Sequence, residues 1–114
     1  MRDALALLDA YVALHNRGVE TGDFRPMLAL FAADAEMAFV GLDFPTLVGI
    51  EEIATAFRDA PPDDALALLD AAASEDGSAE AVFGWRSDPP PFAGTIRIEP
   101  RGGKIRRLTV TVSS

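Results

Sequence analysis

His15 is the only histidine in the chain, and Tyr11 precedes it by four residues. Residues four apart lie on one face of a helix, so the two side chains would be neighbours one turn apart. A neutral imidazole can accept a proton from a substrate, and a phenol can donate a hydrogen bond to a developing negative charge. His15 and Tyr11 are therefore the candidate catalytic residues. A core histidine that only bonds to a neighbour or a backbone carbonyl fits the same pattern equally well.

Other kinds of catalytic centre have no support in the residue types or their spacing. The chain has no cysteine, which excludes disulfides, thiolate nucleophiles and cysteine-ligated metals. One histidine cannot form a multi-histidine metal site, and no phosphate-binding glycine loop or nucleophile elbow occurs in the sequence. We therefore expect no metal site and no cofactor.

Aromatic residues could form a pocket around this pair. Phe83 and Trp85 alternate onto one face of a predicted strand, and Phe39 and Phe57 add aromatic surface from other segments. Most aromatic side chains pack in a core. For Trp85, core packing is therefore the more common role, and stacking against a ligand is the less common one.

Three helices are predicted in the first half of the chain. Over residues 3–20, apolar residues recur three and four apart, and His15 lies within the apolar arc. A second helix is predicted over residues 24–31, with Asp23 as its N-cap. A third is predicted from residue 50 until just before Pro61.

Strands are predicted for most of the remaining chain. Residues 36–40 form a short predicted strand, and a two-residue period from residue 64 onward fits four more. Turn signals occur at Asp76-Gly77, at Pro89 to Pro91 and at Pro100 to Gly103. Helices followed by a run of strands indicate an α+β fold, with the helices packed on one face of a curved, mostly antiparallel sheet.

The charge of the chain is negative and unevenly distributed. Ten basic and eighteen acidic residues give −8, which argues against general affinity for nucleic acid or an anionic membrane. Residues 97–114 are basic, and arginines that pair with acids on neighbouring strands explain this better than a phosphate-binding ribbon. The uncharged apolar run 27–33 is far shorter than the roughly 20 residues of a membrane helix. We expect a soluble, cytoplasmic protein without nucleic-acid or membrane partners.

Several segments resemble one known family. They are Thr21-Gly22-Asp23-Phe24, Leu30-Phe31-Ala32-Ala33-Asp34-Ala35, Gly49-Ile50-Glu51-Glu52-Ile53 and the final run of strands. With these segments the chain resembles the nuclear transport factor 2-like superfamily, which includes ketosteroid isomerases and SnoaL-type polyketide cyclases. The resemblance covers nearly the whole chain. It implies one domain over residues 1–114, a cone-shaped fold of three N-terminal helices on a curved sheet, and a homodimer.

The resemblance also allows the catalytic positions of ketosteroid isomerases to be carried over. Counted from residues 31–35, their general base falls on Phe39, which cannot take a proton. Counted along Thr95-Ile96-Arg97-Ile98, the protonated acid of their oxyanion hole falls on Gly94. Counted back from Gly22-Asp23, their oxyanion tyrosine falls on His15. The resemblance thus implies the fold of these enzymes without their base or acid. The predicted ligand-pocket residues are His15, Tyr11, Phe39, Phe57, Trp85 and Gly94.

Three functions remain open at this point. The favoured one is an apolar pocket that binds a small molecule or has an uncharacterised activity. The second is an isomerase, cyclase or hydrolase that uses His15, together with Tyr11 or Asp43. The third is a structural homodimerisation module that uses the outer face of the sheet, where the alternating residues would be Arg97, Arg107, Thr109 and Thr111.

Overall fold

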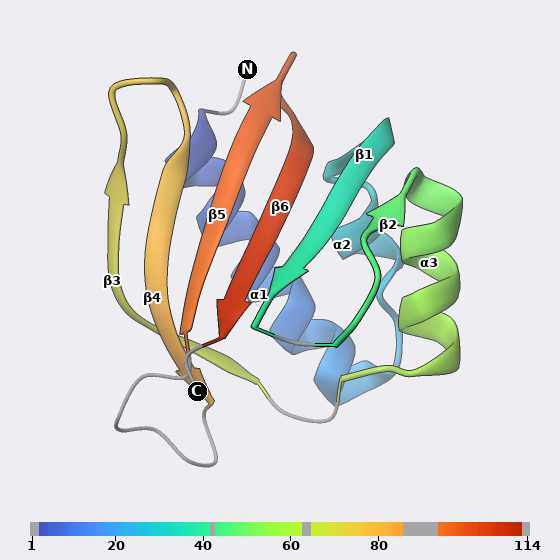
Figure 1. Cartoon of the computed structure of the whole chain (residues 1–114). Helices are drawn as coiled ribbons and strands as arrows, with labels where there is room; N and C mark the ends of the chain where they lie inside the picture. The colour runs from blue at the N-terminus through green and yellow to red at the C-terminus, as the bar shows by residue number, and fades with distance from the viewer. Residues whose placement is uncertain (1–2, 42, 63–64, 86–93, 113–114) are drawn as a thin grey trace.

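The computed structural model describes residues 3–41, 43–62, 65–85 and 94–112. Within these ranges there are three helices and six strands, the predicted order with a two-residue strand, Leu47–Val48, added before the third helix. They are α1 (Ala4–Thr21), α2 (Arg25–Leu28), β1 (Phe31–Val40), β2 (Leu47–Val48), α3 (Ile50–Asp59), β3 (Leu66–Ala73), β4 (Ala79–Trp85), β5 (Gly94–Arg101) and β6 (Lys104–Val112). The helices lie on one face of a curved sheet, which confirms the predicted α+β class (Figure 1).

The six strands form a single sheet in the order β2-β1-β6-β5-β4-β3. Of the strand pairs formed by the described residues, only β1 with β6 is parallel, so the sheet is mostly antiparallel, as predicted. β6 follows every other strand in the chain and yet lies between β1 and β5 (Figure 1).

The register between strands places apolar side chains in rows on the face toward the helices. One row consists of Ala79, Ile98, Leu108 and Met37. The next row consists of Ala81, Ile96, Val110 and Phe39. Most of these side chains are buried, and they join Leu7 and Leu8 of α1 in one core. Alternate residues point to the opposite face of the sheet because strand side chains have a period of two.

Helix α1 is held at both ends and carries the residues of interest along its buried face. The Asp3 side chain caps its start by accepting a hydrogen bond from the Ala6 amide at 2.8 Å. Gly22 ends it in the left-handed conformation, with a φ of 81° that favours glycine. Tyr11 and His15 are both buried, so the predicted apolar arc is the face that packs on the core.

Two local predictions are wrong. α2 ends at Leu28 and starts after Phe24, with the Asp23 carboxylate accepting a hydrogen bond from the Arg25 amide at 3.1 Å. β1 begins at Phe31, whereas the sequence predicts helix there and strand only from residue 36. Alanine-rich residues 32–35 favour helix locally, but Phe31 pairs with Ile105, and pairing with β6 overrides local propensity.

The predicted turns have different outcomes. Asp76 stabilises the turn between β3 and β4, because its carboxylate accepts hydrogen bonds from the amide and hydroxyl of Ser78. Gly102 and Gly103, both with positive φ, join β5 to β6. These two turns are confirmed. The predicted connection at Pro89 to Pro91 lies outside the described residues.

The basic residues near the end of the chain have partners within the protein. The arginine–carboxylate pairs are Arg97 with Asp76, Arg101 with Asp34, Arg106 with Glu99 and Arg107 with Glu36. The Lys104 ammonium donates to the Ala29 carbonyl at 2.7 Å. This confirms the prediction that the arginines pair with acidic residues of the protein itself. No helix in the described ranges has the length and apolarity that crossing a bilayer requires.

Candidate functional site

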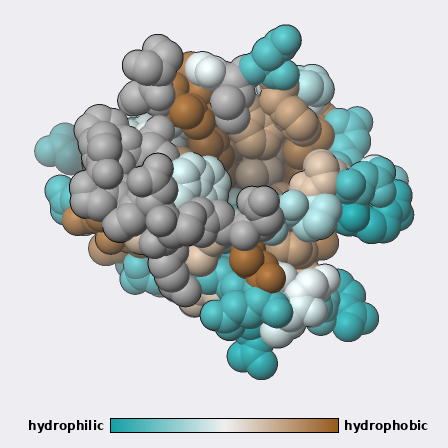
Figure 2. All heavy atoms as spheres, turned by 90° about the horizontal axis from the view of Figure 1, so that it is seen from below, coloured by the Kyte–Doolittle hydropathy of each residue, from teal (hydrophilic) through white to brown (hydrophobic). Residues whose placement is uncertain are grey.

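A cavity of about 260 Å³ lies between the helices and the inner face of the sheet, at the end where β1, β4 and β6 finish. Figure 2 shows apolar side chains gathered around a hollow at this end of the molecule. The lining residues are Tyr11, His15, Met37, Phe39, Phe44, Leu47, Ala56, Phe57, Ala60, Pro62, Leu66, Phe83, Trp85, Ile96, Val110 and Val112. None of these described lining residues carries a carboxylate, ammonium or guanidinium group.

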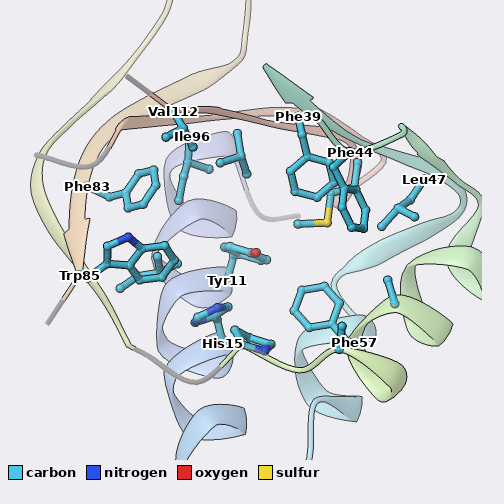
Figure 3. Close-up of a pocket in the computed structure, with 16 residues that line it drawn as sticks. Tyr11, His15, Phe39, Phe44, Leu47, Phe57, Phe83, Trp85, Ile96 and Val112 are labelled. Atoms are coloured by element: carbon cyan, nitrogen blue, oxygen red, sulfur yellow. The ribbon is translucent and has the colours of Figure 1, made fainter. Parts of the chain in front are cut away.

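Five of the six predicted pocket residues line this one cavity. Tyr11 and His15 come from α1, Phe39 from β1, Phe57 from α3 and Trp85 from β4 (Figure 3). They lie together because α1 and α3 pack on the sheet at the end where β1 and β4 finish. Their functional roles remain predictions.

Gly94, the sixth predicted pocket residue, is not among the lining residues. It pairs with Val112 of β6, and a Cβ added to it would lie 1.9 Å from the Thr111 carbonyl oxygen. The position therefore has no room for a side chain of any kind. Asp43, considered from sequence as a partner of His15, is exposed in the loop after β1 and also lies outside the lining.

Asn16 links His15 to the start of β3. Its Oδ1 accepts a hydrogen bond from the Leu66 amide at 2.7 Å, and its Nδ2 donates to the Leu66 carbonyl at 2.9 Å. The His15 Nδ1 lies 3.0 Å from the same Oδ1. All three residues are buried. Sequence reasoning missed Asn16, because its main partner is a backbone group 50 residues away and no side-chain pattern marks such a partner.

Burial determines the ionisation of both polar residues in the lining. Desolvation lowers the pKa of His15, and the hydrogen bond to Asn16 opposes part of that shift. Desolvation also raises the pKa of Tyr11, so the phenol keeps its proton. The Tyr11 hydroxyl points into the cavity (Figure 3), and no described residue forms a hydrogen bond with it. The Tyr11 and His15 ring centroids are 5.9 Å apart.

Two aromatic side chains mark the mouth of the cavity. Phe44 is 45% exposed and Trp85 is 37% exposed, whereas the deeper lining residues Tyr11 and His15 are buried. Phe39 packs edge-on against Phe44 with centroids 4.9 Å apart, and Phe83 packs the same way against Trp85 at 5.7 Å. Phe44 was not predicted, since it lies in a loop without periodicity.

The pKa of His15 should be measurable directly, since the chain has one histidine. We expect an NMR titration to give a value below about 6.5, the ordinary value for histidine. The unfolded chain then binds a proton at higher pH than the folded one. The free energy of unfolding should therefore fall as pH decreases through about 6.5, and level off below the folded-state pKa. His15→Phe should remove this part of the pH dependence. A folded-state value at or above the ordinary one would contradict the burial of an uncharged ring.

The lining of the cavity provides hydrogen-bonding groups in apolar surroundings, but the described lining residues include no carboxylate that could act as a base. Phe39 occupies a wall of the cavity at the position where the resemblance places the isomerase base. The described residues contain no group of three or more histidine, aspartate or glutamate side chains that could hold a metal ion. The polar side chains available to a ligand deep in the cavity are thus Tyr11 and His15.

Comparisons with known proteins give likeness at the level of structure. No family model and no curated protein matches the sequence. A candidate ketosteroid isomerase from Kribbella flavida DSM 17836 superposes with a TM-score of 0.75 at 20% identity, over 97% of this chain and 78% of that one.

Two further solved structures are similar over almost their whole lengths. A candidate polyketide cyclase from Pseudomonas putida KT2440 has a TM-score of 0.73 at 22% identity, over 99% of this chain and 93% of its own. A nuclear transport factor 2-like protein of unknown function from Exiguobacterium sp. 255-15 has a TM-score of 0.70 at 18% identity, over 95% of this chain and 98% of its own. At such identities the likeness concerns the fold alone.

Proposed function

Starting from a chain with the nuclear transport factor 2-like fold, we propose that its cavity binds a small, uncharged, largely apolar molecule. The observation that carries this proposal is a space of about 260 Å³ whose described lining has no charged side chain. An engineered apolar cavity of about 150 Å³ holds benzene. A molecule with two fused rings is therefore a reasonable size for this site.

Trp85 provides the signal for a binding test. It is the only tryptophan of the chain and lies at the mouth of the cavity. Titration with naphthalene should change its fluorescence until saturation, because the ring would enter beside the indole. Absence of a saturable change would contradict ligand binding of this kind.

A cavity-filling variant tests whether the probe enters this space. Ala56 of α3 lines the cavity, whereas the adjacent Thr55 does not. Ala56→Leu should weaken naphthalene binding by about tenfold, equivalent to about 1.4 kcal/mol, by occupying part of the volume. Thr55→Leu is the matched control and should bind as the wild type does. Equal binding by both variants would place the probe elsewhere.

The protein is not expected to isomerise ketosteroids at a useful rate. That reaction removes a proton from a carbon beside a carbonyl and stabilises the resulting dienolate oxygen. Phe39 supplies no base and Gly94 supplies no side-chain donor, and loss of one oxyanion donor alone costs about 100-fold to 1000-fold in other enzymes. The measurement is the absorbance of the conjugated enone product. Rapid turnover would mean that the catalytic positions were assigned to the wrong residues.

We further propose that the outer face of the sheet forms a homodimer. The described helices all pack on the other face (Figure 1). Register across four strands brings together an uncharged outer row: Val82, Thr95, Thr111 and Val40. This row can meet its own copy across a two-fold axis without opposing charges. On the same face, Arg97 and Arg107 are paired with Asp76 and Glu36.

Sedimentation at micromolar concentration should give about twice the mass of the chain, which is 12.1 kDa. Thr111→Arg should shift the protein toward monomer, because the guanidinium would be desolvated against its copy. Thr55→Arg is the matched control and should stay dimeric, because Thr55 is an exposed residue of α3, away from the outer face of the sheet. A monomeric wild type would contradict the proposed homodimer.

A further inference from the structure

The orientation of the Asn16 side chain is fixed by the main chain of β3. Its Oδ1 faces the Leu66 N–H at 2.7 Å and its Nδ2 faces the Leu66 carbonyl at 2.9 Å. A reversed amide would place donor against donor and acceptor against acceptor. The group that faces His15 is therefore the amide oxygen, which can only accept a hydrogen bond.

This oxygen determines which nitrogen of His15 carries the proton. The 3.0 Å contact between His15 Nδ1 and Asn16 Oδ1 is a hydrogen bond only if Nδ1 is the donor. A neutral imidazole has one N–H, so Nε2 is then unprotonated and keeps its lone pair. Because Nδ1 is engaged by Asn16, Nε2 is the polar atom that His15 can offer to the cavity it lines.

Tyr11, one helical turn away, supplies a hydrogen-bond donor, whereas His15 supplies an acceptor. Its buried phenol keeps its proton and points into the same cavity (Figure 3). The deep part of the cavity thus offers one O–H donor and one nitrogen acceptor, and Trp85 adds an indole N–H at the mouth, within a described lining that has no charged side chain. A bound molecule that lacks a donor would leave the nitrogen acceptor without a partner, at a cost in affinity.

We propose that Asn16 is a positioning residue that holds His15 as a hydrogen-bond acceptor, so that the cavity selects uncharged molecules with a hydroxyl group on an apolar ring. This inference rests on the proposed ligand-binding function. Sites built to hydrogen-bond a hydroxyl discriminate strongly against analogues without one, because the buried protein group is then left unpaired. The chemical class is that of a phenol or an enol.

The first test is spectroscopic and requires no ligand. Long-range ¹H–¹⁵N correlation spectra distinguish the two neutral imidazole tautomers, and every imidazole signal belongs to His15. At a pH where the ring is neutral we expect the Nδ1–H form. Predominance of the Nε2–H form would overturn the proposal, and a purely structural role of Asn16 would not determine this signal.

Asn16→Asp provides a second readout. The carboxylate keeps the acceptor for Nδ1 and adds a negative charge beside it, which favours the imidazolium. The pKa of His15 should rise by about one unit or more relative to wild type. An unchanged pKa in a folded variant would mean that this contact does not form, and would overturn the proposal.

The ligand test compares three molecules with the same ring system. Calorimetry at pH 7 should show that 2-naphthol binds about tenfold more tightly than 2-methoxynaphthalene, which has no donor. Naphthalene serves as the apolar reference. In His15→Phe the preference for 2-naphthol should fall to near onefold.

The outcomes separate the two proposals. Binding of naphthalene without a preference for 2-naphthol would overturn hydroxyl selection and leave the apolar-ligand function standing. A preference that persists in His15→Phe would overturn the role of Nε2. Absence of binding by all three molecules would overturn both proposals.

Discussion

Gly94→Ala is expected to lower the free energy of unfolding by about 3 kcal/mol or more, the upper end of what overpacking costs. The added Cβ would lie 1.9 Å from the Thr111 carbonyl oxygen and 3.1 Å from the Val112 Cα. Both are main-chain atoms of β6, so relief requires β5 and β6 to move apart. Urea unfolding measures the loss.

Thr95→Ala is the matched control for this substitution. Thr95 is the next residue of β5, half-buried on the outer face and paired with Thr111. Thr95 also belongs to the proposed dimer row, so both variants are compared with wild type at one protein concentration. Loss of the Thr95 side chain should cost less than about 1 kcal/mol, because no main-chain clash is involved. Equal midpoints for Gly94→Ala and wild type would contradict the close approach of these strands.

The same contact limits what can be built on this fold. Restoring both isomerase carboxylates would need Phe39→Asp together with Gly94→Asp. Phe39 lines the cavity and has room for a smaller side chain, whereas Gly94 has none. We therefore expect the double variant to unfold, and an oxyanion donor would have to come from another strand position.

Asn16→Ala is expected to lower the free energy of unfolding by about 3 kcal/mol, since each buried backbone group left unpaired costs about 1–3 kcal/mol. The substitution removes the partners of both the N–H and the C=O of Leu66, which is 5% exposed. Urea unfolding gives the total loss. Hydrogen exchange at the Leu66 amide, protected in the wild type, should become fast.

Asn16→Asp separates the two halves of this interaction. It retains the acceptor for the Leu66 N–H and leaves only the Leu66 carbonyl without its donor. Hydrogen exchange at the Leu66 amide should therefore stay slower than in the alanine variant, because this N–H keeps its acceptor. A loss below about 1 kcal/mol for Asn16→Ala would mean that water replaces the amide at little cost.

The periodicity of apolar residues was sufficient to predict an element and its buried face where a segment buries one face along its whole length. α1 is such a segment, and the sequence predicts both its extent and the shared face of Tyr11 and His15. Prediction failed where a distant strand decides the conformation. Residues 31–35 are strand because β6 lies beside them, and nothing within those residues indicates it.

The candidate site shows the same division. Aromatic residues at strand and helix periodicity were predicted, and five of the six predicted positions line one cavity. The role of Asn16 is set by the main chain of Leu66, and the lack of space at Gly94 is set by the main chain of Thr111. Both partners are distant in the chain. A sequence identifies side chains and not which backbone groups they meet, so the link to Leu66 and the closed position at Gly94 required the fold.

The place of β6 in the sheet also constrains how the chain can fold during synthesis. β1 at residues 31–40 and β5 at residues 94–101 can be joined only after residues 104–112 have left the ribosome. Until then the apolar rows of β1 and β5 lack the strand between them, and the cavity lacks part of its wall. Contacts this distant in sequence slow folding and prolong the exposure of apolar surface. We therefore expect the apolar rows of β1 and β5 to stay exposed in the nascent chain until translation has passed β6.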